Sequence, residues 1–246
     1  MRFFTVSKGF DTIKSNKTEG ALIMKEKRLL FKGIVLILVF ILWTVLIQKV
    51  DVKPIGQNGT DVGFATLNLS FHNLTGVNML IYHITDWLGL VPIFCCMIYG
   101  VVGFVQFVKR KSLLKVDVDI LLLGVYYVIV IFGYLIFEMI SINYRPILIN
   151  GTMEASYPSS TTLLVLSVMP TVIFQIDRRI KNRVVRRIIT SSTILFSLFM
   201  LIGRTVAGVH WLTDIIGSII LAMGLFLIYY SSVVLFDRKW RVCSGI

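Results

Sequence analysis

Residues 119–141 read DILLLGVYYVIVIFGYLIFEMIS, a stretch in which 120–137 carries no charged side chain. A helix of roughly 20 apolar residues is long enough to cross the hydrocarbon core of a bilayer. Five other stretches have a similar length and composition: 33–50, 87–108, 161–176, 188–203 and 210–236. None has the alternation over about ten residues that is typical of an outer-membrane barrel strand. The sequence therefore predicts an all-α polytopic membrane protein, a bundle of six transmembrane helices.

The overall composition agrees with a membrane protein and bears on its partners. Of the 246 residues, 56% are hydrophobic and 15% are charged, and 25 Lys and Arg against 13 Asp and Glu leave a net charge of +12. Because the basic residues lie between apolar stretches, topology explains them better than a nucleic-acid partner, and none is expected. Cys95, Cys96 and Cys243 lack the spacing of a zinc site or a disulfide framework. We predict no metal and no cofactor, with membrane lipids as neighbours.

The distribution of Lys and Arg predicts the orientation in the membrane. Four segments hold 21 of these 25 residues: 1–32, 109–117, 177–187 and the tail after 236. The positive-inside rule places such segments on the cytoplasmic side. We expect a multi-pass plasma-membrane protein with both termini in the cytoplasm, in which a basic segment, 1–32, precedes a six-helix membrane domain, 33–246.

Three segments are then extracytoplasmic: 51–86, 142–160 and 203–210. The first mixes apolar residues with Gly and Asn and carries His72 and His83, which is typical of an amphipathic segment at the membrane interface. Glycosylation sequons occur at four positions: Asn58, Asn68, Asn73 and Asn150. They are acceptors only in a host with a secretory pathway, so their modification depends on the host.

The stretch 203–214, GRTVAGVHWLTD, contains the most informative ionisable residues. His210 and Asp214 are four residues apart, so at the start of the last predicted helix they would share a face. The carboxylate could then accept a hydrogen bond from one imidazole nitrogen, leaving the other free to attack phosphorus. An isolated pair with this spacing is also typical of a structural hydrogen bond, so further residues are needed to distinguish a catalytic pair from a structural one.

Groups suited to an anion come from three separate regions on the same predicted face. Arg204 has a planar, permanently charged guanidinium that suits bidentate phosphate binding. Arg145 precedes Pro146 in the preceding outer segment, and Ser159 and Ser160 open the fourth predicted helix, where amides and hydroxyls can bind an anion. This combination favours a phosphate site over an ordinary helix cap.

The order of these groups resembles the three-part signature of the type 2 phosphatidate phosphatase superfamily, six-helix membrane enzymes that act on lipid phosphates. The matching elements are R-P at 145–146, P-S-S at 158–160 and R-x5-H-x3-D at 204–214. The resemblance covers about 119–236, the phosphatase-like core, and the rest of the chain only in hydropathy.

The resemblance implies a role for each matching residue. His210 would be the nucleophile, and Asp214 would orient it. The phosphate would be held by four residues: Arg145, Arg204, Ser159 and Ser160. No metal takes part in that scheme.

Two positions depart from the family pattern. The first motif of the family begins with Lys, where this chain has Glu138, and the second ends in His, where it has Thr161. That His is the general acid that protonates the leaving oxygen, and losing such an acid can lower a rate by about 10²–10⁴-fold. The sequence offers three substitute acids: Glu154, His72 and His83. Glu138 can instead pair with Arg145.

We therefore expect a phosphatase that acts on a lipid phosphate or polyprenyl pyrophosphate at the extracytoplasmic face, through a phosphohistidine on His210. A pyrophosphate would tolerate the missing acid best, because its leaving phosphate is a better leaving group than an alkoxide. Two alternatives stay open: a lipid phosphotransferase, in which an acceptor hydroxyl replaces water, and a non-catalytic protein that binds lipid phosphates. The identity of the lipid and the oligomeric state do not follow from the sequence.

Overall fold

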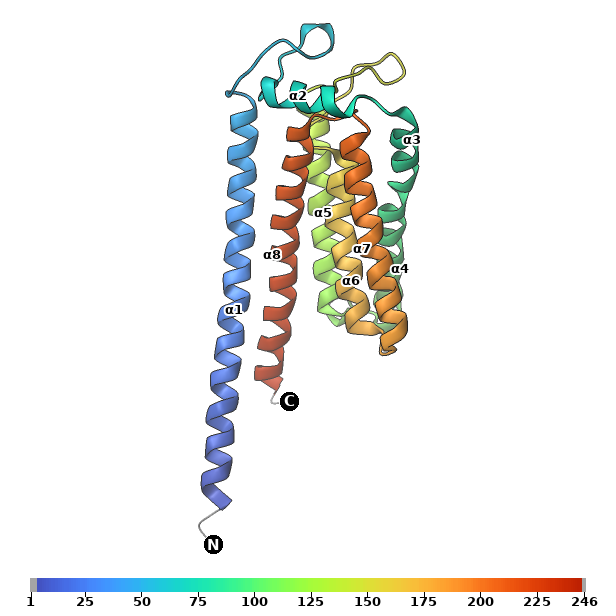
Figure 1. The fold of residues 1–246 in the computed structure, drawn as a ribbon. Helices are drawn as coiled ribbons and strands as arrows, with labels where there is room; N and C mark the ends of the chain where they lie inside the picture. Colours follow the sequence, from blue (N-terminus) through green and yellow to red (C-terminus); the bar gives the residue numbers. More distant parts are fainter. Residues whose placement is uncertain (1–3, 245–246) are drawn as a thin grey trace.

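The computed structural model describes the backbone of residues 4–244 and the side chains of residues 23–238. Eight α-helices follow one another along this part of the chain (Figure 1): α1 (Phe4–Ile47), α2 (Ala65–Thr75), α3 (Met79–Leu88), α4 (Leu90–Arg110), α5 (Val118–Met139), α6 (Ser160–Arg179), α7 (Arg183–Val206) and α8 (Leu212–Ser244). Strand pairing within 4–244 is limited to isolated bridges. The predicted all-α class is confirmed.

Six segments of the described chain are long and apolar enough to cross a membrane: Ile23–Ile47, Met79–Arg110, Val118–Met139, Ser160–Arg179, Arg183–Val206 and Leu212–Arg238. They form the predicted six-helix bundle, and Figure 1 shows them running side by side. Helix α1 packs along α8 and extends beyond the other helices at the end opposite α2.

The second span is longer than the sequence predicts. Helices α3 and α4 meet at Gly89 and together form one span that begins at Met79. The predicted outer segment 51–86 therefore loses its last eight residues, 79–86, to the membrane bundle. The polar side chains His83 and Asp86 interrupt the apolar pattern of α3, which is why the hydropathy of the sequence places the start of this span too late.

Helix α2 lies across one end of the bundle, together with the loops 48–64 and 140–159 (Figure 1); we call this the α2 end. Asn68 anchors α2 to the start of α8. Its buried amide nitrogen donates to the Gly63 carbonyl at 2.8 Å and to the Thr213 hydroxyl at 3.0 Å, and its amide oxygen accepts from the Thr213 N–H at 3.2 Å. Because the side chain is enclosed and bonded, the sequon at Asn68 is not an accessible glycan acceptor in this fold.

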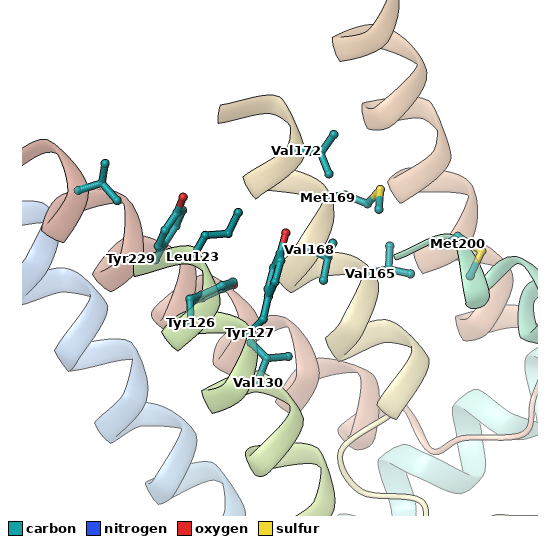
Figure 2. Packing of buried hydrophobic residues seen from close by; sticks show 11 residues of the cluster. Leu123, Tyr126, Tyr127, Val130, Val165, Val168, Met169, Val172, Met200 and Tyr229 are labelled. Carbon is teal, nitrogen blue, oxygen red and sulfur yellow. The ribbon is translucent and has the colours of Figure 1, made fainter. Parts of the chain in front are cut away.

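The main core lies between α5, α6 and α8 and contains tyrosines among aliphatic side chains (Figure 2). Each tyrosine hydroxyl finds a partner inside the bundle. Tyr126 donates to the Ser167 carbonyl at 3.0 Å, Tyr127 pairs with the Thr171 hydroxyl at 2.7 Å, and Tyr229 accepts from Gln175 at 2.7 Å. Such bonds join helices in hydrocarbon, where an unpaired polar group is costly.

At the opposite end, two arginines of the predicted basic segment 177–187 form ion pairs with a buried carboxylate. Arg178 Nε lies 3.3 Å and Arg179 Nη2 lies 2.8 Å from the Asp119 carboxylate, whose side chain is only 6% exposed. Arg178 also pairs with Asp237 at 2.7 Å. These two cations therefore join α5, α6 and α8 in addition to any effect on topology.

Candidate active site

His210 lies in the turn between α7 and α8, two residues before α8 begins, and it is 5% exposed. Its Nδ1 is 3.1 Å from the Ser156 carbonyl oxygen, which can only accept, so the ring proton sits on Nδ1. Its burial and then the charges of Arg145 and Arg204 hold the pKa of His210 well below its ordinary value. The ring is therefore neutral, and Nε2 carries the lone pair.

Asp214 reaches His210 through Ser156. The Asp214 carboxylate is 4.0 Å from Nδ1 of His210, which is too long for the direct hydrogen bond that the spacing predicts. It accepts instead from the Ser156 hydroxyl, from the Trp211 N–H at 2.9 Å and from the Asn143 amide at 3.3 Å. The direct bond does not form because His210 precedes the helix on which Asp214 lies, so the two do not share a helical face.

The turn that carries His210 requires a glycine. Gly208 has a φ of +69°, and a Cβ atom there would lie 1.9 Å from the Gly76 carbonyl oxygen. The preceding Ala207 carbonyl accepts from the Asn78 N–H at 3.0 Å. The α7–α8 turn is therefore packed against the α2–α3 turn, which holds His210 at the α2 end.

Arg204 and Arg145 form a buried pair of cations beside His210. They are 1% and 9% exposed, and Nη2 of Arg204 lies 3.2 Å from Nε2 of His210. Within the described residues, Nε and Nη1 of Arg204 and Nη1 of Arg145 have no hydrogen-bond partner. Two desolvated like charges with free N–H groups make a site that favours a bound anion.

Helix α3 contributes two residues to this site that sequence reasoning missed. The Tyr82 ring lies under both guanidinium groups, 5.1 Å from the Arg204 carbon and 5.8 Å from the Arg145 carbon. One turn later, Oδ1 of Asp86 lies 3.5 Å from Nη1 of Arg204. A Tyr in an outer segment carries no signal of such a contact; only the recognition of α3 as a membrane helix could have pointed to it.

The two serines of the second motif have different surroundings. Ser159 is fully buried, and its hydroxyl pairs with the Thr162 hydroxyl at 3.0 Å while its carbonyl accepts from Ser218 at 3.0 Å. Ser160 lines a narrow pocket together with His210 and Ser156. Of the two predicted phosphate ligands, the structure brings Ser160 to the pocket and engages Ser159 with α6 and α8.

The remaining predicted residues occupy distinct places around the site. Nε of Arg145 pairs with Glu154 at 3.1 Å, so the partner suggested for Glu138 is taken by Glu154. Glu138 is exposed and lines the narrow pocket of His210. His72 packs on the Trp211 ring at 5.6 Å, and its burial lowers its pKa, whereas His83 is exposed beside Tyr82.

A larger cavity of about 450 Å³ lies between α4, α5 and α6. Its wall is mostly apolar, with Asp86, Ser160 and Thr161 among the polar lining residues. It shares Tyr134, Ser160 and Leu163 with the narrow pocket of His210. The cavity therefore adjoins the narrow pocket of His210.

The comparisons with known proteins bear on the fold and on the family of the chain. The fold is similar to the crystal structure of the first transmembrane PAP2 type phosphatidylglycerolphosphate phosphatase from Bacillus subtilis, with a TM-score of 0.57 and 17% identity over 85% of this chain and 97% of that chain. No curated protein sequence matches the chain. Residues 96–238, more than half of the chain, match the model of the PAP2 superfamily. The chain therefore belongs to the PAP2 superfamily, the family whose signature its motifs resemble.

Proposed function

We propose that this protein is a lipid-phosphate phosphatase that works through a phosphohistidine on His210. The observation that carries the proposal is the contact between Nε2 of His210 and Nη2 of Arg204, 3.2 Å apart, next to guanidinium N–H groups without partners. A phosphate oxygen that binds Arg204 brings its phosphorus next to the lone pair of Nε2. This is the juxtaposition of nucleophile and anion site that phosphoryl transfer requires.

In the first step, Nε2 of His210 attacks phosphorus, an N–P bond forms, and the P–O bond to the lipid breaks. The imidazole becomes cationic because Nδ1 keeps its proton, which it donates in a hydrogen bond to the Ser156 carbonyl. Asp214 supplies the balancing negative charge through the Ser156 hydroxyl. In the second step, water attacks phosphorus, the N–P bond breaks, and inorganic phosphate leaves the arginines.

The cavity next to the site supports a lipid substrate. Its apolar wall between α4, α5 and α6 suits a hydrocarbon tail, and it meets the narrow pocket of His210 at Ser160. A lipid can keep its tail among the membrane helices while its phosphate meets Arg145 and Arg204. A lipid monophosphate and a polyprenyl pyrophosphate both satisfy this arrangement.

The charge distribution supports a site on the outer face of the plasma membrane, with both termini in the cytoplasm. All the site residues lie at the α2 end. The opposite end carries most of the Lys and Arg, which the positive-inside rule assigns to the cytoplasm.

The proposal is tested with purified full-length protein in detergent and a panel of lipid monophosphates and diphosphates. We expect phosphate release, and a phosphorylated protein that is acid-labile and base-stable when the reaction is quenched. His210→Ala should abolish both. Ser70→Ala, on the exposed face of α2, is the control and should leave both unchanged.

The same assay separates the alternatives. Release of phosphate to an added alcohol in preference to water would identify a phosphotransferase. Tight binding of lipid phosphates without any release by the unaltered protein would contradict an enzymatic function and support a lipid-phosphate-binding protein.

A further inference from the structure

The reaction proposed above lacks a proton donor for the leaving oxygen. The position at which the family signature has its acid is Thr161, and a hydroxyl is a poor acid at neutral pH. An in-line displacement places the leaving oxygen on the side of phosphorus opposite the nucleophile. The donor therefore has to lie across the phosphate from His210.

Arg204 has His210 on one side of its guanidinium and a carboxylate on the other. Nη2 lies 3.2 Å from Nε2 of His210, and Nη1 lies 3.5 Å from Oδ1 of Asp86. A phosphate bound by both nitrogens would thus have the imidazole near one edge and Asp86 near the other. The Asp86 side chain is 55% exposed, so it can reach a substrate.

Asp86 also lies where the lipid tail would leave the phosphate. It lines the cavity between α4, α5 and α6 together with Ser160 and Thr161, and it is the only carboxylic acid among the lining residues. Gly89, three residues on, packs against Thr161: a Cβ atom there would lie 3.1 Å from the Thr161 methyl carbon. The C-terminal end of α3 therefore contacts Thr161, the position at which the family signature has its acid.

The other acids suggested by the sequence are less well placed. Glu154 pairs with Arg145 at 3.1 Å, and Glu138 lines the narrow pocket of His210, on the side of the nucleophile. His72 packs on Trp211, and His83 is absent from the lining of both pockets.

We propose that Asp86 is the general acid and base of this enzyme. The inference rests on the proposed phosphatase function. As the P–O bond breaks, the protonated Asp86 carboxyl gives its proton to the leaving oxygen, which departs as the lipid alcohol. The Asp86 carboxylate then takes a proton from the water that attacks the phosphohistidine, which restores the protonated carboxyl.

The test compares two substrates with different leaving groups on the Asp86→Asn variant. A dialkylglycerol phosphate has an alkoxide leaving group that needs a proton, whereas an alkyl-chain nitrophenyl phosphate has a phenolate that does not. On the phenyl substrate we expect a burst of about one equivalent of nitrophenol, at a rate within about tenfold of the unaltered enzyme, followed by turnover about 10²–10⁴-fold slower. The phosphohistidine should accumulate. The alkyl substrate should give no burst and the same 10²–10⁴-fold loss.

Two results would overturn the role of Asp86: a nitrophenol burst slowed as much as the alkyl reaction, or an unchanged rate on the alkyl substrate. Asp61→Asn is the matched control, because Asp61 is exposed in the loop 48–64 and lines neither pocket. If the Asp86→Asn variant does not elute as a folded protein in size-exclusion chromatography, Asp86→Ser takes its place. We expect the same burst and the same slow turnover from it. If the unaltered protein releases phosphate from neither substrate and from none of the lipid diphosphates in the panel, the proposed function itself fails; release from diphosphates alone overturns the role of Asp86 as the acid for an alkoxide.

Discussion

The carbonyl oxygen of Ser156 lies 3.1 Å from Nδ1 of His210, and the hydroxyl of the same serine bonds to Asp214. One residue of the loop before α6 thus sets the tautomer of His210, the proposed nucleophile, and links it to the Asp214 carboxylate. The spacing in the sequence suggests that Asp214 orients His210 directly. In the structure the two are linked through Ser156, so three residues form one unit. Ser156 lies two residues before the Pro158 motif, which explains how a short loop can reach the histidine.

Ser156→Ala should lower kcat because it removes one hydrogen bond to Asp214 while keeping the carbonyl contact to His210. A hydrogen bond to a charged group contributes about 1.5–3 kcal/mol, so a loss of roughly tenfold to a hundredfold is expected. Combining it with Asp214→Asn should cost little more than the larger single change, because the two residues act as a unit. The measurement is kcat for the four members of the cycle. Fully additive losses would contradict the unit, and Ser70→Ala on the exposed face of α2 is the control.

Tyr82→Leu should weaken phosphate binding more than it slows chemistry. Its ring lies under both guanidiniums, and a desolvated cation–π contact is worth about 2 kcal/mol, so we expect KM and the inhibition constant of vanadate to rise by about tenfold or more. Tyr82→Phe retains the ring and should retain both constants. Equal effects of the Leu and Phe changes would show that the hydroxyl, and not the ring face, matters.

His210 should stay neutral at pH values at which an ordinary histidine is protonated. Burial and the two arginines lower its pKa well below 6.5, so protonation, and with it loss of the lone pair, occurs only at more acidic pH. The unfolded chain takes up this proton first, so His210 makes the fold less stable as the pH falls below about 6.5.

The measurement is an NMR titration of protein with isotope-labelled histidine, in which His210→Gln assigns the signal. The resonance should report the neutral form with the proton on Nδ1 below pH 6. Arg145→Gln removes one of the lowering charges and should move the titration toward higher pH. An ordinary titration in the unaltered protein would contradict the buried neutral ring.

The α2 end should face the outside of the cell. Thr152 lies in an exposed turn of the loop 140–159, so a Thr152→Cys change in a cysteine-free background should react with a membrane-impermeant thiol reagent on intact cells. Ser112→Cys, in the short connection at the opposite end, should react only after permeabilisation. The reverse pattern would place the active site in the cytoplasm.

Several features of the fold follow from local sequence. The six spans are predicted because the length of an apolar run, as in 119–141, decides whether a helix can cross a bilayer. The start of the second span is predicted too late because His83 and Asp86 interrupt the apolar run. Of these two polar side chains, Asp86 contacts Arg204, so one of the residues that obscure the helix lies at the proposed site.

The sequence by itself determined the membrane class and the residue types of the proposed phosphate site, because helix length and the motifs around Arg145, Ser160, Arg204 and His210 are properties of short segments. Only the tertiary structure decided which groups meet. Ser156 separates His210 from Asp214, and α3 brings Tyr82 and Asp86 to Arg204 from more than 100 residues away in the chain. Such contacts depend on how helices pack across the bundle, which the spacing within any one segment does not specify.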